Sequence, residues 1–85
     1  MTVKDLNKKV GKNIRLYRDL REISQKEFAY MLDVSDSIVT NWENGNKFPR
    51  ADNLLMISTV LEIEVWELFY TGKFVLTGDE KFKYT

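Results

Sequence analysis

The stretch 24–45 constrains this chain more than any other, because it contains two helix starts separated by a very short turn. Ser24, with Glu27 three residues later, forms a capping-box pattern, which predicts a helix beginning at the next residue. Ser35 predicts the start of a second helix, and Asn44-Gly45 is a typical stop signal. Two short helices joined so closely must cross steeply, which predicts a helix-turn-helix.

Both predicted helices have an apolar face at helical spacing. The inward positions are Phe28, Ala29 and Leu32 in the first helix and Ile38, Val39 and Trp42 in the second. We expect Trp42 to be a core anchor, because it shares a face with Val39. The opposite face of the second helix is polar and consists of Asp36, Ser37, Thr40 and Asn41. Our hypothesis is that this face reads DNA.

Length and composition indicate one small folded domain. The chain has 85 residues, of which 44% are hydrophobic and 31% charged, a balance typical of globular proteins. No apolar run approaches the roughly 18–20 residues that cross a bilayer, and the start of the chain lacks the apolar core of a signal peptide. We therefore expect a cytoplasmic protein with no membrane partner.

The absence of cysteine and histidine excludes several kinds of site. Disulfides, thiolate nucleophiles, Cys/His metal sites and Ser-His-Asp triads all need one of these residues. The carboxylates fall on predicted helices without a pocket pattern. The sequence therefore predicts neither catalytic residues nor a metal or cofactor, and the chain is not expected to be an enzyme.

The formal net charge of zero argues against duplex binding at first sight, because much of that affinity comes from neutralising phosphates. The charges are unevenly distributed, however. Residues 1–50 carry ten Lys and Arg against seven Asp and Glu, whereas residues 51–85 carry three against six. This distribution is compatible with a basic face and an acidic back.

Three further helices are predicted around the central pair. The first covers about 5–21, with Thr2 as a cap, and Gly11 within it indicates close approach by a neighbouring helix. Pro49 precedes a helix over about 52–61, in which Leu55 is expected to be partly buried, and a last short helix covers about 65–70. The fold class is therefore an all-α, compact five-helix bundle, and residues 1–71 form the expected domain.

The remaining segment, 72–85, differs in composition. It is rich in β-branched and aromatic residues, with Gly78-Asp79 where a two-residue hairpin turn would lie. A lone hairpin is marginal in water. The segment could pack on its own domain, pair with another chain for self-association, capture a protein partner, or remain a poorly ordered terminus.

The chain resembles the phage-repressor/Cro-type helix-turn-helix family, also called the XRE family. The resemblance covers about residues 6–70 and depends on an ordered combination of residues rather than on a single one. The matching residues are Val10-Gly11, Ile14-Arg15, Tyr17-Arg18, Ile23-Ser24-Gln25, Glu27-Phe28-Ala29, Leu32, Val34-Ser35, Val39, Trp42-Glu43-Asn44-Gly45, Pro49, Leu54 and Leu61.

This resemblance implies sequence-specific binding of double-stranded DNA, usually by a homodimer on a palindromic operator, with the helix over about 36–44 in the major groove. The residues implied to contact base edges are Asp36, Ser37, Thr40 and Asn41. Those implied to contact phosphates are Gln25, Ser35, Asn44, Lys47 and Arg50. Arg18 and Glu43 match a structural ion pair between the first and third helices.

Three positions depart from the family pattern. Asp33 replaces the favoured glycine of the turn, although Asp tolerates the left-handed region better than most residues. Asp36 places a negative charge near phosphates, so that it would help only by accepting a hydrogen bond from cytosine. Ile38 either contacts thymine methyl groups or covers the edge of the core.

The leading interpretation is a transcriptional regulator, a repressor from a phage, mobile element or bacterial chromosome. One alternative is a DNA-binding antitoxin or immunity component, whose tail clamps a protein partner. Another is a helical interaction module that has lost DNA binding. The latter predicts no salt-dependent duplex binding, and sedimentation of the chain alone separates a self-associating tail from one that captures a second protein.

Overall fold

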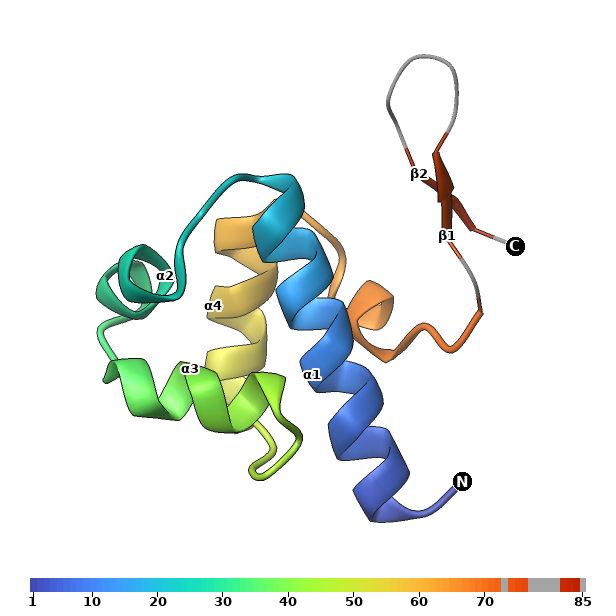
Figure 1. The fold of residues 1–85 in the computed structure, drawn as a ribbon, viewed down its shortest axis with the longest axis horizontal. Coiled ribbons are helices and arrows are strands. Elements are labelled where there is room, and N and C mark those ends of the chain that lie inside the picture. Colours follow the sequence, from blue (N-terminus) through green and yellow to red (C-terminus); the bar gives the residue numbers. More distant parts are fainter. Residues whose placement is uncertain (73, 77–81, 85) are drawn as a thin grey trace.

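The structure, a computed structural model, describes residues 1–72, 74–76 and 82–84, which form a helical bundle followed by two short strands (Figure 1). The elements are α1 (Val3–Leu20), α2 (Gln25–Leu32), α3 (Asp36–Glu43), α4 (Ala51–Leu61), η1 (Val65–Phe69), β1 (Phe74–Leu76) and β2 (Phe82–Tyr84). The predicted all-α class is confirmed. The fifth helix is a single 3₁₀ segment rather than an α-helix, and α3 ends one residue before the predicted boundary.

Capping side chains set where the first two helices begin. Thr2 and Asp5 exchange backbone-to-side-chain hydrogen bonds of 3.1 Å each, so that α1 begins at Val3 rather than near residue 5. The backbone N–H that Thr2 donates lowers the pKa of the Asp5 carboxyl. Ser24 and Glu27 form the predicted capping box of α2. These reciprocal bonds satisfy amide groups that a helix start otherwise leaves without partners.

The turn between α2 and α3 depends on a left-handed residue. Asp33 has φ 56° and ψ 47°, and its backbone N–H donates back to carbonyls of the last turn of α2. The next N–H, of Val34, donates to the carbonyl of Ala29 over 3.0 Å. Asp33 therefore makes the turn that the family usually assigns to glycine, as the sequence predicted.

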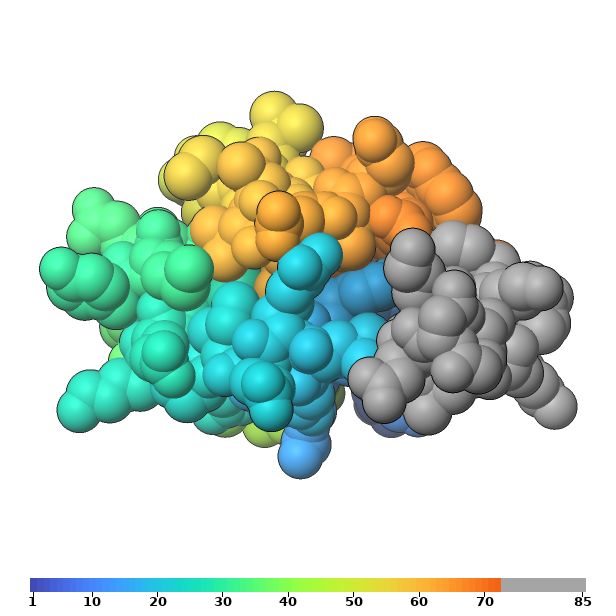
Figure 2. Space-filling model, turned by 90° about the horizontal axis from the view of Figure 1, so that it is seen from above, coloured from blue at the N-terminus to red at the C-terminus, as the bar shows by residue number. Residues whose placement is uncertain are grey.

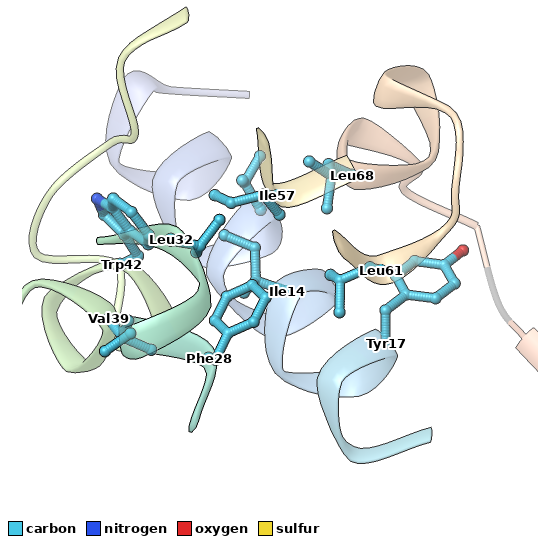
Figure 3. Close-up of a cluster of buried hydrophobic side chains, with 11 residues drawn as sticks. Ile14, Tyr17, Phe28, Leu32, Val39, Trp42, Ile57, Leu61 and Leu68 are labelled. Atoms are coloured by element: carbon cyan, nitrogen blue, oxygen red, sulfur yellow. The ribbon is translucent and has the colours of Figure 1, made fainter. Parts of the chain in front are cut away.

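Apolar side chains from α1, α2, α3, α4 and η1 meet in one core (Figure 3). Trp42 is 3% exposed and lies with Leu32 and Val39 on one side of this core, which confirms its role as an anchor. The buried apolar residues are Val10, Ile14, Tyr17, Phe28, Ala29, Leu32, Val39, Trp42, Ile57, Leu61 and Leu68. Full burial of a large apolar side chain contributes about 1.5–3 kcal/mol, so this set holds the elements together.

Asn13 is a buried polar residue inside the bundle that the sequence pattern did not reveal. Its side-chain amide donates to the carbonyl oxygens of Leu68 over 2.8 Å and Tyr70 over 2.9 Å. The residue is only 2% exposed. It therefore attaches the end of η1 to α1 and satisfies carbonyl groups that a 3₁₀-helix leaves at its end.

Gly11 lies where α1 crosses the end of α3. A Cβ atom at this position would lie 2.2 Å from the carbonyl oxygen of Trp42 and 2.8 Å from that of Glu43. Real Cβ atoms essentially never approach another atom this closely. The close helix approach predicted from this glycine is confirmed, and it fixes the position of α3 relative to α1.

The outer surfaces of α4 and η1 form one continuous side of the molecule (Figure 2). Leu55 is 60% exposed, so the prediction that it is partly buried was wrong. Met56 is 49% exposed and Trp66 of η1 is 55% exposed. An amphipathic pattern on α4 alone did not show which of its many apolar residues face the core.

The strands β1 and β2 pair antiparallel, with Phe74 opposite Tyr84 and Leu76 opposite Phe82. The tail thus contains the strand pairing that was one of the predicted arrangements. The two-residue turn predicted at Gly78-Asp79 lies outside the described residues.

Candidate nucleic-acid interface

The outward face of α3 is polar and accessible. Asp36, Ser37 and Asn44 are exposed, and Thr40 and Asn41 are half-buried beside them. The side chain of Asn41 makes no hydrogen bond within the part of the chain that the structure describes. This face therefore presents amide, hydroxyl and carboxylate groups, the types of group that read base edges.

The inward face of α3 is fixed by an ion pair to α1. Glu43 accepts two hydrogen bonds from the guanidinium of Arg18, at 2.7 Å from Nε and 3.0 Å from the terminal nitrogen. The side chain of Arg18 is 8% exposed and that of Glu43 is 2% exposed. The hydrogen bond to Glu43 is the main cause that raises the pKa of Arg18. A two-point contact of this kind fixes orientation as well as distance.

Arg18 also binds the chain that leads into α2. Its third nitrogen donates to the carbonyl oxygen of Ile23 over 2.6 Å and lies 3.2 Å from the carboxylate of Asp19. One buried guanidinium thus connects α1, the start of the helix-turn-helix and the end of α3.

Gln25, the first residue of α2, contacts α3 directly. Its Nε2 donates to Oε1 of Glu43 over 3.0 Å, and its Oε1 lies 3.3 Å from the hydroxyl of Thr40. The resemblance implied a phosphate contact for Gln25 but gave no sign of these two contacts. Glu43 is shared by Arg18 and Gln25, so the structural pair and the implied phosphate residue form one cluster.

The start of α3 is held by serine side chains. Ser35 Oγ accepts the backbone N–H of Ile38 over 3.3 Å, which confirms Ser35 as the cap. The hydroxyl of Ser37 lies 3.1 Å from that of Ser35. Ile38 is half-buried and packs against the core, so it covers the core edge, one of the two roles the sequence left open.

A groove of about 470 Å³ separates the turn before α3 from the start of α4. Lys47 and Arg50 line it, together with Val34, Ile38 and Phe48. Arg50 forms an exposed ion pair of 3.1 Å with Asp52. Two cations predicted to contact phosphates therefore line the same groove beside α3, and an acidic residue partly offsets the charge of Arg50.

No described helix combines the length and the apolar character needed to cross a bilayer. Within the described residues, no group of three or more Asp or Glu side chains is arranged to hold a metal ion.

Comparison with known proteins assigns the fold to a family. A family described as helix-turn-helix matches residues 14–66, more than half of the chain. The chain belongs to the helix-turn-helix family. The match places it with the phage-repressor (XRE) type, whose members are DNA-binding transcriptional regulators and not enzymes.

Three relatives illustrate the similarity. The chain is 34% identical over 64 residues to the HTH-type transcriptional regulator DicA of Escherichia coli K12, covering 74% of this chain and 47%, about half, of that regulator. The restriction-modification controller protein C.AhdI of Aeromonas hydrophila has 32% sequence identity and a TM-score of 0.70. This match covers 74% of the present chain and 96% of C.AhdI. The P22 c2 repressor, solved with a synthetic operator, has 30% sequence identity and a TM-score of 0.68. This match covers 71% of the present chain and 91% of the repressor chain.

Proposed function

We propose that this helix-turn-helix protein is a transcriptional repressor that binds a palindromic operator as a homodimer in the cytoplasm. The observation that carries the proposal is the contrast between the two faces of α3. Its inner face is fixed by Arg18, Gln25 and Gly11, whereas its outer face is polar and accessible. The similarity to a repressor solved on its operator supports the same use of this helix.

In this proposal α3 enters the major groove. Asn41 pairs with an adenine edge, since its amide is free of partners among the described residues and Asn can bind adenine through two hydrogen bonds. Ser37 binds a base edge through its hydroxyl, Thr40 meets a thymine methyl group, and Asp36 accepts from cytosine. These four residues determine which sequence is bound.

The residues at both ends of α3 hold the backbone. Ser35 lies at the start of α3, Gln25 contacts Glu43 at its end, and Asn44, Lys47 and Arg50 follow that end in the sequence. Phosphate contacts of this kind set the position of the protein on the duplex without reading its sequence. Residues 1–71 act as the DNA-binding unit.

The homodimer is supported by apolar surface away from α3. Leu55 and Met56 of α4 and Trp66 of η1 are about half or more exposed, and these two elements form one continuous side of the molecule (Figure 2). Exposed apolar side chains on adjoining elements are typical of protein–protein contacts. We propose that this side, together with the tail 72–85, forms the dimer contact, which would bring two copies of α3 onto two half-sites.

Selection of binding sites from a random duplex pool tests the proposal, with sedimentation of the free and bound protein alongside. We expect an enriched sequence with two-fold symmetry, affinity that falls as salt is raised, and two chains per duplex. A lack of salt-dependent binding to any duplex would instead support an interaction module without DNA binding. A single chain per duplex at high protein concentration would remove the dimer from the proposal.

A further inference from the structure

The cluster around Glu43 determines which way the Gln25 amide is turned. A carboxylate that accepts from Arg18 is ionised and can only accept hydrogen bonds. The atom of Gln25 that lies 3.0 Å from it must therefore be the nitrogen, so that the amide oxygen is the atom near Thr40. The orientation of the Gln25 amide is thus set by its contacts with Glu43 and Thr40.

The hydroxyl of Thr40 is turned toward the protein. It lies 3.3 Å from the amide oxygen of Gln25 and 3.1 Å from the carbonyl oxygen of Asp36. Both neighbours are acceptors within hydrogen-bond distance, so the single hydroxyl proton is directed toward the protein, where the Gln25 amide oxygen and the Asp36 carbonyl share it. A hydroxyl in this arrangement leaves the methyl group of Thr40 as its part of the DNA-facing surface.

One N–H of Gln25 remains after these contacts. The Nε2 group has two hydrogens, and one of them binds Glu43. The second has no partner among the residues that the structure describes. A reversed amide would bring an oxygen toward the Glu43 carboxylate and present the wrong polarity to a phosphate. The fixed orientation therefore keeps a donor available for the DNA backbone.

We propose that Thr40 is a positioning residue, which acts on the DNA backbone through Gln25 rather than by donating a hydrogen bond to a base. Thr40 and Glu43 hold the two ends of the Gln25 amide, and the remaining N–H binds a phosphate. The inference rests on the proposed function, because it names the part that Thr40 plays in the same interface.

Substitutions at the two residues test the coupling. Thr40→Val removes the hydroxyl and keeps the methyl group and shape, whereas Thr40→Ser keeps the hydroxyl. We would measure dissociation constants of wild type, Thr40→Val, Thr40→Ser, Gln25→Ala and the double variant Gln25→Ala with Thr40→Val. Each would be tested on a selected duplex and an arbitrary duplex. Ser37→Ala, alone and with Gln25→Ala, is the matched control on the same helix.

We expect Thr40→Val to weaken binding to both duplexes by roughly three- to tenfold, the effect of one hydrogen bond, with their affinity ratio unchanged. Thr40→Ser should keep wild-type affinity for the arbitrary duplex. In the Gln25→Ala background, Thr40→Val should have no further effect, whereas Ser37→Ala should add its own. Without DNA, Thr40→Val should shift the Gln25 side-chain amide signals in NMR spectra, and Thr40→Ser should not.

The inference would be overturned if Thr40→Val weakened binding equally in the wild-type and Gln25→Ala backgrounds. A changed ratio of affinities for the two duplexes would also overturn it. Unchanged Gln25 amide signals in Thr40→Val would do the same. If wild type binds no duplex, the proposed function fails and the inference fails with it. If wild type binds but the two effects are additive, only the inference fails.

Discussion

Arg18 and Glu43 lie 25 residues apart and form a buried two-point ion pair, with nitrogen–oxygen distances of 2.7 and 3.0 Å. The pair joins the last turn of α1 to the last residue of α3. Glu43 also accepts a hydrogen bond from Gln25. The same carboxylate therefore fixes both the end of α3 and the start of α2.

Removing one partner of this pair should strongly destabilise the fold. Arg18→Ala leaves the Glu43 carboxylate buried without its counter-charge, and we expect the free energy of unfolding to fall by roughly 3–5 kcal/mol. Urea unfolding followed by tryptophan fluorescence measures this. Arg15→Ala is the control, because its contact with Asp19 is 3.8 Å long and exposed, and such pairs contribute little. The interpretation is wrong if the two variants lose similar stability.

Gly11→Ala should destabilise the protein even though alanine is the better helix former. Alanine gains roughly 1 kcal/mol over glycine in helix propensity. However, the new Cβ would lie 2.2 Å from a backbone oxygen of Trp42, and α3 must move to relieve this clash. We expect a net loss of about 1–3 kcal/mol, measured by thermal unfolding. Lys12→Ala, at the next and exposed position, should retain stability. A Gly11→Ala variant as stable as wild type would show that α3 shifts without cost.

Asn41 and Arg50 should affect DNA binding in different ways. Asn41→Ala should change the preference among sequences, since its amide is available to a base, with a loss of roughly 1–3 kcal/mol on the preferred duplex. Arg50→Ala should weaken binding to all duplexes and reduce the salt slope by about 1. Titrations of selected and random duplexes at two salt concentrations measure both effects.

The control for Arg50 is Asp52→Asn, which removes the carboxylate 3.1 Å from the guanidinium. It should keep or increase affinity for every duplex. Equal losses across all sequences for Asn41→Ala would remove it from the set of base-reading residues.

Tyr17 should make the fold sensitive to alkaline pH. Burial raises the pKa of Tyr17 above its ordinary value of 10.0, with Glu67 and Tyr70 adding to the shift. The folded state therefore holds this proton more tightly than the unfolded state. The resulting stability is fully present below pH 10 and is lost as the pH rises above it, by up to about 1.4 kcal/mol per pH unit.

Urea unfolding between pH 9 and 11 tests this effect of Tyr17. The stability of Tyr17→Phe should fall less steeply above about pH 10 than that of wild type, because phenylalanine has no proton to lose. Tyr30→Phe is the matched control, since Tyr30 is 88% exposed, and its profile should follow wild type. Identical slopes for all three proteins would contradict the prediction.

Local signals in the sequence were enough to predict most of the fold. Ser24 with Glu27 fixed the start of α2 because a capping box uses only neighbouring residues. Gly11 indicated a close helix approach because few other roles explain glycine inside a helix. The burial of Trp42 followed from the face it shares with Val39.

The features that the sequence did not reveal depend on contacts between distant residues. Asn13 contacts carbonyl groups more than 50 residues away, and a polar residue on a helix gives no local sign that it is buried. The exposure of Leu55 depends on which face of α4 packs against the core. In the candidate site, the resemblance suggested roles for Gln25 and Thr40 separately, but their contact exists only once α2 and α3 have crossed.

Three left-handed turns also bear on how much stability this protein has. Glu22, Asp33 and Glu62 all have φ 56°, a conformation that costs an ordinary L-residue of order 1 kcal/mol more than glycine. All three lie at connections between helices and outside the outward face of α3. Substitutions at these three turns can therefore raise or lower the stability of the fold without altering the residues on the outward face of α3.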